Sequence, residues 1–257
     1  LTVREPFQMW GIQGDESLAE KLPFVKAGLP GVFVTPDVTP YKKRKVRILN
    51  GAHTGFVPGS WVAGFDIVRD CMHDETVKGF MDKMLHDEVI PTLAADLDVD
   101  DCESFADAVA NRFDNPFIDH QLLSICLNST AKWRARDLPT LKDYVAMKGE
   151  LPRCLATSLA TLISFYTQEL VGREDDGLHL RRSDGTEYTA QDDAFVLDFY
   201  AKHVGADDAE LVHEVLTDEQ MWGEDLTQIA GLEDFVVKAL ATVRVEGAKQ
   251  AFANAIA

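Results

Sequence analysis

The sequence is poor in cysteine, and the few cysteines are far apart. The four are Cys71, Cys102, Cys126 and Cys154, and no two form a Cys-x-x-Cys pair. This spacing argues against a disulfide framework and against a zinc site built on cysteine pairs. It is typical of free thiols in a reducing compartment, so we expect a cytoplasmic protein.

Long apolar runs are also missing. No stretch reaches the roughly 18 apolar residues that a membrane-spanning helix needs. The most apolar stretch, 154–166, is interrupted by Thr and Ser, which favours a buried core helix. The first ten residues show no basic region followed by an apolar core, so they are not typical of a signal peptide. They also lack an initiator Met, and we expect the chain to be part of a longer protein.

Positive charge is scarce. The chain has 25 Lys and Arg against 43 Asp and Glu, a formal net charge of −18. A surplus of this sign argues against nucleic acids and anionic membranes as main partners. A glycine-rich phosphate loop of the G-x-G-x-x-G type after a strand is absent as well. The chain therefore carries no obvious dinucleotide-binding fold of its own.

What the sequence does contain is helical periodicity, from Pro40 onward. The segment before it is predicted to be extended, with a short strand at 31–35 between two prolines. Asp184-Gly185 sits between alternating flanks and predicts a β-hairpin over 178–188. We expect a mainly α fold: a multi-helical domain with a short extended N-terminal segment and one small β-hairpin. Helices are predicted at 40–56, 60–71, 75–90, 102–113, 118–136, 140–148, 153–170, 190–202, 207–216 and 232–257, with caps at Thr39, Ser60 and Asp207.

One stretch stands out chemically, at 39–54. It holds four consecutive basic residues, Lys42 to Lys45, in an otherwise acidic chain, and Asn50 and His53 follow. On an α-helix, Asn50 lies about 140° and His53 about 80° around the axis from Lys45. The three side chains then share less than half the circumference, on a face expected to be half-buried. A lysine, an amide and an imidazole together can take a proton, polarise a carbonyl and hold a hydroxyl.

Lys45 differs from the other cations of the run. Lys42, Lys43 and Arg44 are expected to point to solvent. Lys45 follows cationic neighbours near the positive end of a helix, and both effects disfavour its ammonium form. Partial burial would add to them, and such a lysine loses its proton more readily, as a general base must.

The same segment resembles the signature of the mannitol dehydrogenase family of polyol-specific long-chain dehydrogenases. That motif is a Lys, four residues, an Asn, two residues and a His, here Lys45, Asn50 and His53. The wider likeness is to the hexuronate branch of the family, whose members interconvert tagaturonate and altronate. It rests on the strings Glu5-Pro-Phe7 with Trp10, 22–29, 39–54, Asn115-Pro-Phe-Ile118 with 122–125, and Leu138-Pro-Thr140.

The resemblance implies a two-domain enzyme of which this chain is the second part. Residues 1–38 would be the extended end of a Rossmann-type NAD-binding domain, and 39–257 the helical catalytic and substrate domain. NAD would be bound mainly by the N-terminal domain of the same full-length chain, which is the expected partner, and no metal would be needed. By the same resemblance Lys45 is the general acid/base, Asn50 a donor to the developing oxyanion, and His53 a contact for substrate hydroxyls.

The expected substrate-binding residues differ from those of the polyol-oxidising members. These carry an Arg eight residues before a Lys; here the Lys is Lys132, but the Arg position is Ser124. A sugar acid adds a carboxylate, which Lys132, Arg134 or Arg136 could meet, and an Arg would suit a bidentate pair. The metal-like strings at 73–75 and 86–88 lack His-Glu-x-x-His spacing, so we expect no metal there.

Two other functions stay open at this point. A relative acting on fructuronate and mannonate, or on a neutral polyol such as mannitol, would carry the same motif. A non-catalytic helical module would instead use the basic run from Lys42 to Arg47 to dock an acidic partner.

Overall fold

The computed structural model describes residues 9–257. The chain divides into two compact units, of which the first ends at Val46 and the second comprises Arg47–Ala257. The Glu5-Pro-Phe7 string lies outside the described residues. None of the helices in the described part is long and apolar enough to cross a membrane. The domain boundary predicted at 38/39 concerns a longer protein and stays a prediction.

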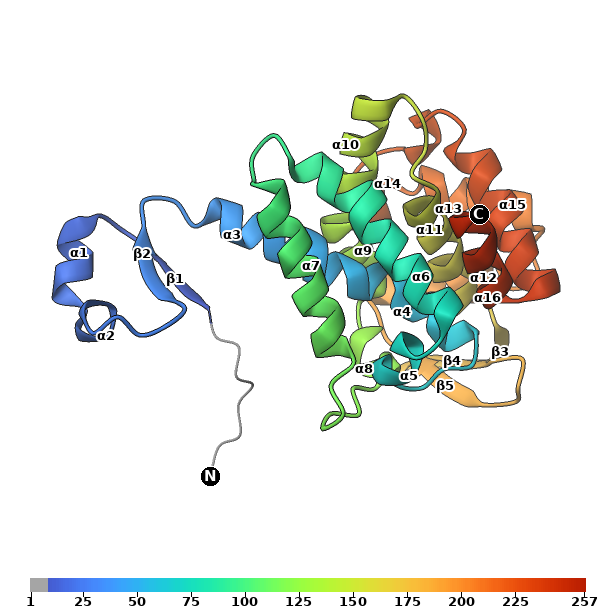
Figure 1. The fold of residues 1–257 in the computed structure, drawn as a ribbon. Helices are drawn as coiled ribbons and strands as arrows, with labels where there is room; N and C mark the ends of the chain where they lie inside the picture. Colours follow the sequence, from blue (N-terminus) through green and yellow to red (C-terminus); the bar gives the residue numbers. More distant parts are fainter. Residues whose placement is uncertain (1–8) are drawn as a thin grey trace. The chain divides into compact units, whose positions relative to one another are not determined.

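The first unit is a small α/β element (Figure 1). Strand β1 (Trp10–Gln13) runs parallel to β2 (Val32–Thr35), and helices α1 (Glu16–Lys21) and α2 (Pro23–Lys26) lie between them in sequence. Parallel strands require such a crossover connection. The predicted strand at 31–35 is confirmed, but the two helices were missed. The Asp15 carboxylate accepts the Leu18 N–H, and Pro23 opens α2, so local caps form helices too short to show periodicity.

The predicted helix 40–56 is longer than expected and is not α-helical throughout. Helix α3 (Thr39–Arg44) is followed directly by the π-helix η1 (Lys45–Asn50) and then by α4 (Gly51–Val62). The cap residue is Val38 rather than Thr39, and a proline in the first turn is confirmed. Ser60 is not a cap: it lies inside α4, and its hydroxyl donates to the Phe56 carbonyl at 2.9 Å. The predicted helix 60–71 is instead the last turn of α4 and the separate helix α5, with residues 63–67 outside any helix.

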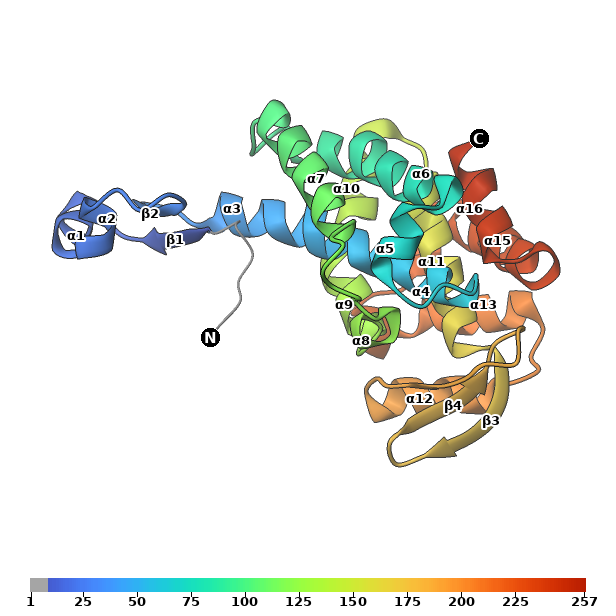
Figure 2. The same ribbon diagram turned by 60° about the horizontal axis from the view of Figure 1, so that its bottom comes forward.

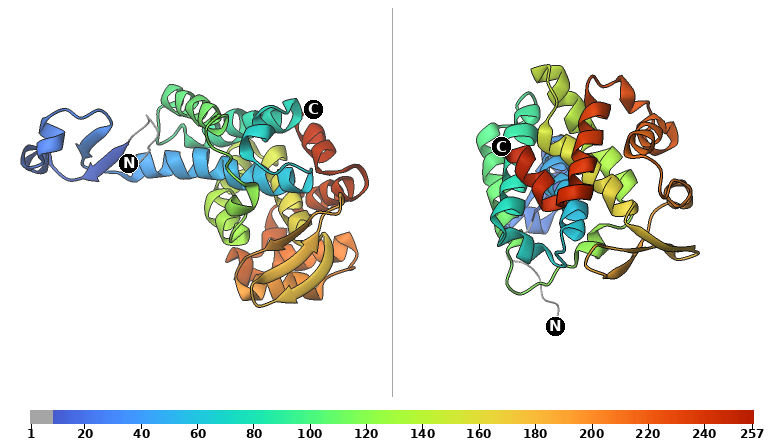
Figure 3. Two further views of the ribbon diagram at one scale, coloured as in Figure 1. Left: turned by 90° about the horizontal axis from the view of Figure 1, so that it is seen from below. Right: turned by 90° about the vertical axis from the view of Figure 1, so that its right-hand side faces the viewer.

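The second unit is built around α4 and α11 (Arg153–Tyr166), which pack against each other. In Figure 3, α4 (blue to cyan) runs through the middle of this unit. Residues 154–166 are all buried, which confirms the predicted core helix. The other helices are α5 (Val68–Met72), α6 (Glu75–Lys83), η2 (Met84–Val89), η3 (Ile90–Leu93), α7 (Val99–Phe113), α8 (Leu122–Ile125), α9 (Ser129–Arg136), α10 (Leu138–Lys148), α12 (Ala194–Lys202), α13 (Asp208–Thr217), α14 (Glu219–Trp222), η4 (Leu226–Gln228), α15 (Leu232–Glu246) and α16 (Ala248–Ile256).

Helix α11 is buried from its second residue onward, and its first N–H groups are satisfied inside the core. The buried carboxylate of Glu88, from η2, accepts the N–H groups of Cys154 at 2.7 Å and Leu155 at 2.9 Å. These are first-turn donors that have no partner within the helix. Burial raises the pKa of Glu88 to about 7, although the two N–H bonds act in the opposite direction. Glu88 thus joins η2 to the central helix.

Two predicted helices are each broken in two. The prediction over 118–136 becomes α8 and α9, and residues 118–121 are not helical. Residues 126–128 separate the two helices, and among them Asn128 has a left-handed φ of 52°. The prediction over 232–257 becomes α15 and α16, separated by Gly247 at φ 94°. An Asn tolerates this conformation and a Gly adopts it freely, so both residues turn the chain where periodicity alone runs on.

The predicted hairpin is confirmed and carries a third strand. Strands β3 (Glu169–Glu174), β4 (Gly177–Arg181) and β5 (Glu187–Ala190) form an antiparallel sheet in sequence order. The turn at Asp184-Gly185 joins β4 to β5 as predicted. Helix α12 packs against β3 and β4 (Figure 2). The mainly α fold class is confirmed, with a sheet slightly larger than expected.

Candidate active site

The three motif residues lie on η1 and the start of α4. Lys45 and Asn50 are the first and last residues of the π-helical segment. In a π-helix the N–H of residue i+5 bonds to the C=O of residue i, so Asn50 lies about one turn along from Lys45. The α-helical angle of about 140° is therefore wrong for this pair. Segments of this kind are frequent at functional sites.

The exposure of the three side chains differs. Lys45 is exposed, whereas Asn50 and His53 are half-buried. The expected half-buried face is thus found for Asn50 and His53 but not for Lys45. Of the neighbouring cations, Arg44 is buried rather than pointing to solvent; its guanidinium lies 6.0 Å from the centre of the Tyr41 ring.

His53 is held between aromatic rings. Its imidazole stacks on Phe113 at 4.0 Å between ring centres and lies edge-on to His120 at 5.5 Å. The Nε2 atom is buried and has no hydrogen-bond partner within the described residues. Burial lowers the pKa of His53 from 6.5 to about 3, helped by the positive charges of His120, Arg136, Arg112 and Lys132. His53 is therefore a neutral imidazole, able to exchange a hydrogen bond with a hydroxyl.

Arg136 contacts the same turn of the chain. From the end of α9, its Nη1 donates to Thr54 Oγ1 at 3.0 Å and to the Asn50 carbonyl at 3.4 Å. These two acceptors flank His53 in sequence. The structure therefore brings Asn50, His53 and Arg136 together, which the sequence could place only on separate helices.

Lys132 lies one turn before Arg136 on α9. Its Nζ donates to the Ile125 carbonyl at 2.9 Å, and the side chain is half-buried. Burial and the charge of Arg136 hold the pKa of Lys132 below its usual value. Ser124, at the family's Arg position, is exposed, and its hydroxyl donates to the Gln121 carbonyl at 2.7 Å. Arg134, the third candidate, is also exposed.

A buried acid lies behind Arg136. Asp137 is 1% exposed, and burial raises its pKa well above the usual value despite the nearby charges of Arg136 and Arg47. Its carboxyl is thus a weak counter-charge to Arg136. Arg47 instead pairs with Asp143 at 3.2 Å and donates to Thr140 Oγ1 at 2.5 Å.

Sequence reasoning missed His120, which approaches His53. It belongs to the loop after α7, and this loop is fixed by Arg69. Arg69 Nη1 donates to the Pro116 carbonyl at 3.2 Å, and Nη2 pairs with Asp119 at 2.6 Å. The available signal was the Asn115-Pro-Phe-Ile118 string, which ends two residues before His120. A loop has no periodicity from which the direction of a side chain could be predicted.

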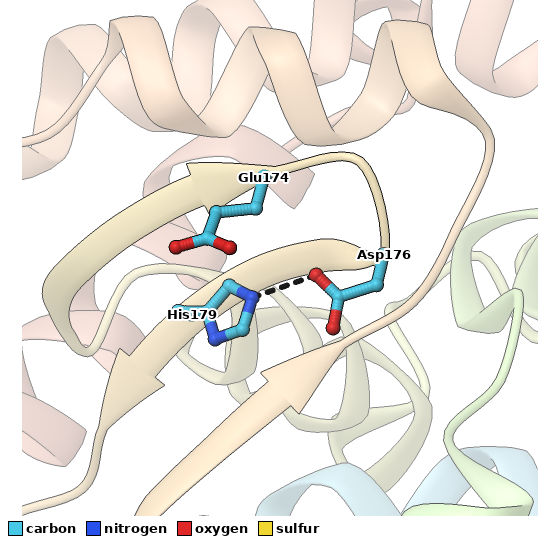
Figure 4. Close-up of side chains that lie close together, drawn as sticks. All are labelled: Glu174, Asp176 and His179. Atoms are coloured by element: carbon cyan, nitrogen blue, oxygen red, sulfur yellow. Dashed lines mark hydrogen bonds and ion pairs between the residues drawn. The ribbon is translucent and has the colours of Figure 1, made fainter.

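A separate group of potential metal ligands lies on the β-sheet. Glu174, Asp176 and His179 bring one ligand atom each to within 4.8 Å of one another. Figure 4 shows these three side chains close together. His179 Nε2 lies 2.8 Å from Asp176 Oδ1, and both carboxylates are exposed. The pair lowers the pKa of Asp176 and raises that of His179. The strings at 73–75 and 86–88 contribute no ligand to this group, and the expected absence of a metal stays a prediction.

Comparison with known proteins gives the family. The sequence profile of the mannitol dehydrogenase C-terminal domain matches residues 37–244. The chain therefore belongs to the mannitol dehydrogenase C-terminal domain family. This confirms the resemblance drawn from Lys45, Asn50 and His53.

The relatives within this family point to one branch. A protein named altronate oxidoreductase from Pectobacterium carotovorum is 44% identical over 253 residues, covering 96% of this chain and 50% of the relative. One of the same name from Yersinia enterocolitica is 41% identical over 259 residues, covering 98% of this chain and 50% of the relative. The chain thus spans about half the length of the curated relatives it matches.

A solved structure confirms the fold. Mannitol 2-dehydrogenase from Pseudomonas fluorescens, in a ternary complex with NAD and D-mannitol, matches with a TM-score of 0.72 and 22% identity. The match covers 88% of this chain and 42% of that one. At this identity the likeness concerns the fold.

Proposed function

We propose that this chain is the C-terminal catalytic domain of a cytoplasmic, NAD-dependent tagaturonate reductase, which interconverts D-tagaturonate and D-altronate. The identity of 41–44% to proteins named altronate oxidoreductase supports the sugar-acid substrate. The single observation that carries the proposal is the motif at the π-helical segment, with a neutral His53 beside the cationic side chains of α9. These positive charges would favour binding of an anionic sugar.

Lys45 is the proposed proton donor and acceptor. During reduction its ammonium gives a proton to the carbonyl oxygen of the substrate, and during oxidation its amine takes the alcohol proton back. The carboxamide of Asn50, one turn along, donates a hydrogen bond to the same oxygen as negative charge develops there. Both groups would act on one atom of the substrate, and the π-helical segment that carries them is of a kind frequent at functional sites.

His53, Lys132 and Arg136 are the proposed substrate contacts. A neutral imidazole can bond a sugar hydroxyl without adding a competing charge. Lys132 and Arg136 would face the carboxylate, and the planar guanidinium of Arg136 can bind it with two parallel N–H bonds. Asp137 does not cancel this charge, because burial raises the pKa of Asp137 and disfavours its ionised form.

NAD supplies or accepts the hydride, and its binding falls mainly to the N-terminal domain of the full-length protein. The residues described here fit the substrate side of such a reaction: a lysine, an amide and a neutral imidazole. The sequence contains no glycine-rich phosphate loop that would hold the pyrophosphate. The chain by itself is therefore expected to show no NADH oxidation with tagaturonate.

The test uses the full-length enzyme and two lysines of the same basic run. Lys45→Ala should fold, bind NADH and lose at least about a thousandfold in kcat, because general acid–base catalysis and charge placement act together. Lys42→Ala is the matched control, since Lys42 is an exposed neighbour in α3, and should retain activity. Retained turnover in Lys45→Ala contradicts the assigned role. A loss of partner binding without a redox defect would instead support a docking module.

The substrate is tested separately on wild-type enzyme, with tagaturonate, fructuronate and fructose in parallel. We expect tagaturonate to be reduced with the highest kcat/KM. Comparable turnover of fructose would contradict the sugar-acid assignment, and faster turnover of fructuronate would move the enzyme to the mannonate reaction.

A further inference from the structure

His120 is the group nearest to His53 that the motif does not include. The two rings meet edge to face, with 5.5 Å between their centres and 89° between their planes. His53 lies beneath, with its Nε2 buried, while His120 is exposed at the surface. The exposed imidazole of His120 thus lies against the ring that carries the buried nitrogen.

Two cationic side chains and the exposed imidazole of His120 lie around His53. His120 comes from the loop after α7, and Lys132 and Arg136 come from α9. None of the three forms an ion pair with an acidic side chain in the described part of the chain. Lys132 and Arg136 donate only to uncharged oxygens: the carbonyls of Ile125 and Asn50, and the Thr54 hydroxyl.

This arrangement is unusual for a chain with a net charge of −18. Elsewhere, half-buried arginines have acidic partners: Arg173 pairs with Asp198 at 2.9 Å, and Arg181 with Glu187 at 2.7 Å. Asp192 and Asp137 act on Lys132 and Arg136 electrostatically, but neither forms a direct ion pair with them in the described part of the chain. The like charges therefore still repel one another, and a bound anion reduces that repulsion. A carboxylate can accept hydrogen bonds from an imidazole N–H and a guanidinium at the same time, and the bond from the guanidinium is charge-assisted.

We propose that His120 is a substrate-binding residue that selects for the carboxylate of a sugar acid, which it binds together with Arg136 and Lys132 above the buried ring of His53. This rests on the proposed function and goes beyond it. The motif residues act on the carbonyl and hydroxyl groups that every sugar substrate of the family shares. His120 acts on the group that separates an acid from a neutral polyol.

The binding test uses the full-length enzyme in the presence of NADH, so that the alcohol substrate cannot react. Affinities for D-altronate and for the uncharged D-altritol are measured by calorimetry. His120→Asn should weaken altronate binding at least tenfold and leave altritol binding within twofold. His120→Asp, which adds a negative charge, should weaken altronate binding further. His213→Asn is the matched control, because His213 is an exposed histidine on α13 that pairs with Glu233.

Steady-state kinetics then separate selection from folding. In His120→Asn the KM for tagaturonate should rise at least tenfold while kcat changes less than threefold. Unchanged altronate affinity, or an equal loss for altronate and altritol, overturns the assignment. A wild-type enzyme that binds altronate through His120 but does not reduce tagaturonate would defeat the proposed reaction and support the carboxylate site. A wild-type enzyme that binds no altronate overturns both.

Discussion

At the scale of single residues, His53 shows how function and stability oppose each other. Its ring fills a place against Phe113 that a hydrocarbon ring would fill as well, yet its Nε2 is buried without a partner. A buried polar atom without a hydrogen bond costs about 1–3 kcal/mol. We infer that this unpaired atom is retained because the substrate supplies its partner.

The pH dependence of stability should reveal this cost. The pKa of His53 falls from 6.5 to about 3 on folding. Between these values the unfolded chain binds a proton that the native protein does not, so stability is lost as pH falls below 6.5. Above pH 6.5 the imidazole is neutral in both states and contributes no pH dependence.

His53→Phe should therefore be more stable than the wild type, and its advantage should grow by about 2 kcal/mol between pH 7 and pH 5, at ~1.4 kcal/mol per pKa unit. Urea unfolding of both proteins at several pH values measures the difference in the free energy of unfolding. The contributions of all other titratable groups are common to both proteins and cancel in this difference. An advantage that does not change with pH would contradict the buried, neutral state of His53.

At the scale of elements, the close approach of α4 to its neighbours sets the position of the motif. A Cβ added to Gly59 would lie 2.4 Å from Phe252 of α16 and 2.9 Å from Thr161 of α11. Both distances are too short for a carbon contact, so only glycine permits this packing. The helix that carries His53 is thus held against the core two turns further along.

Gly59→Ala should destabilise the protein by about 1–3 kcal/mol, because the core must shift to admit the methyl group. Gly79→Ala is the matched control in α6, where the added Cβ would be 3.6 Å from Ile256, an ordinary contact. It should raise stability by up to about 1 kcal/mol through helix propensity. Equal effects of the two substitutions in thermal unfolding would contradict the close packing of α4.

At the scale of the whole molecule, all four cysteines are free and buried, as expected for thiols that serve packing. Burial raises the pKa of Cys71 to about 12 and also raises those of Cys126 and Cys154. The reactive thiolate is therefore suppressed and shielded from solvent.

A thiol reagent such as DTNB at pH 8 should label well under one cysteine per molecule of native protein within minutes. After unfolding in guanidinium it should label all four. Counting the released chromophore measures both states. Rapid labelling of the native protein would show that the core opens readily or that a cysteine is exposed.

The sequence by itself determined the helical class, the hairpin at Asp184-Gly185, the buried helix over 154–166 and the family. These follow from periodicity, turn chemistry and a local motif, all of which act over neighbouring residues. Only the tertiary structure decided that Lys45 and Asn50 share a π-helical turn, that Ser60 lies inside α4, and that Arg136 and His120 meet His53. The position of Arg136 depends on a contact between residues 86 positions apart. The π-helical turn and the extent of α4 are departures from the regular helices that periodicity predicts. The charged side chains near His53 come from elements that are far apart in the sequence. A local sequence pattern therefore cannot predict that they lie close together.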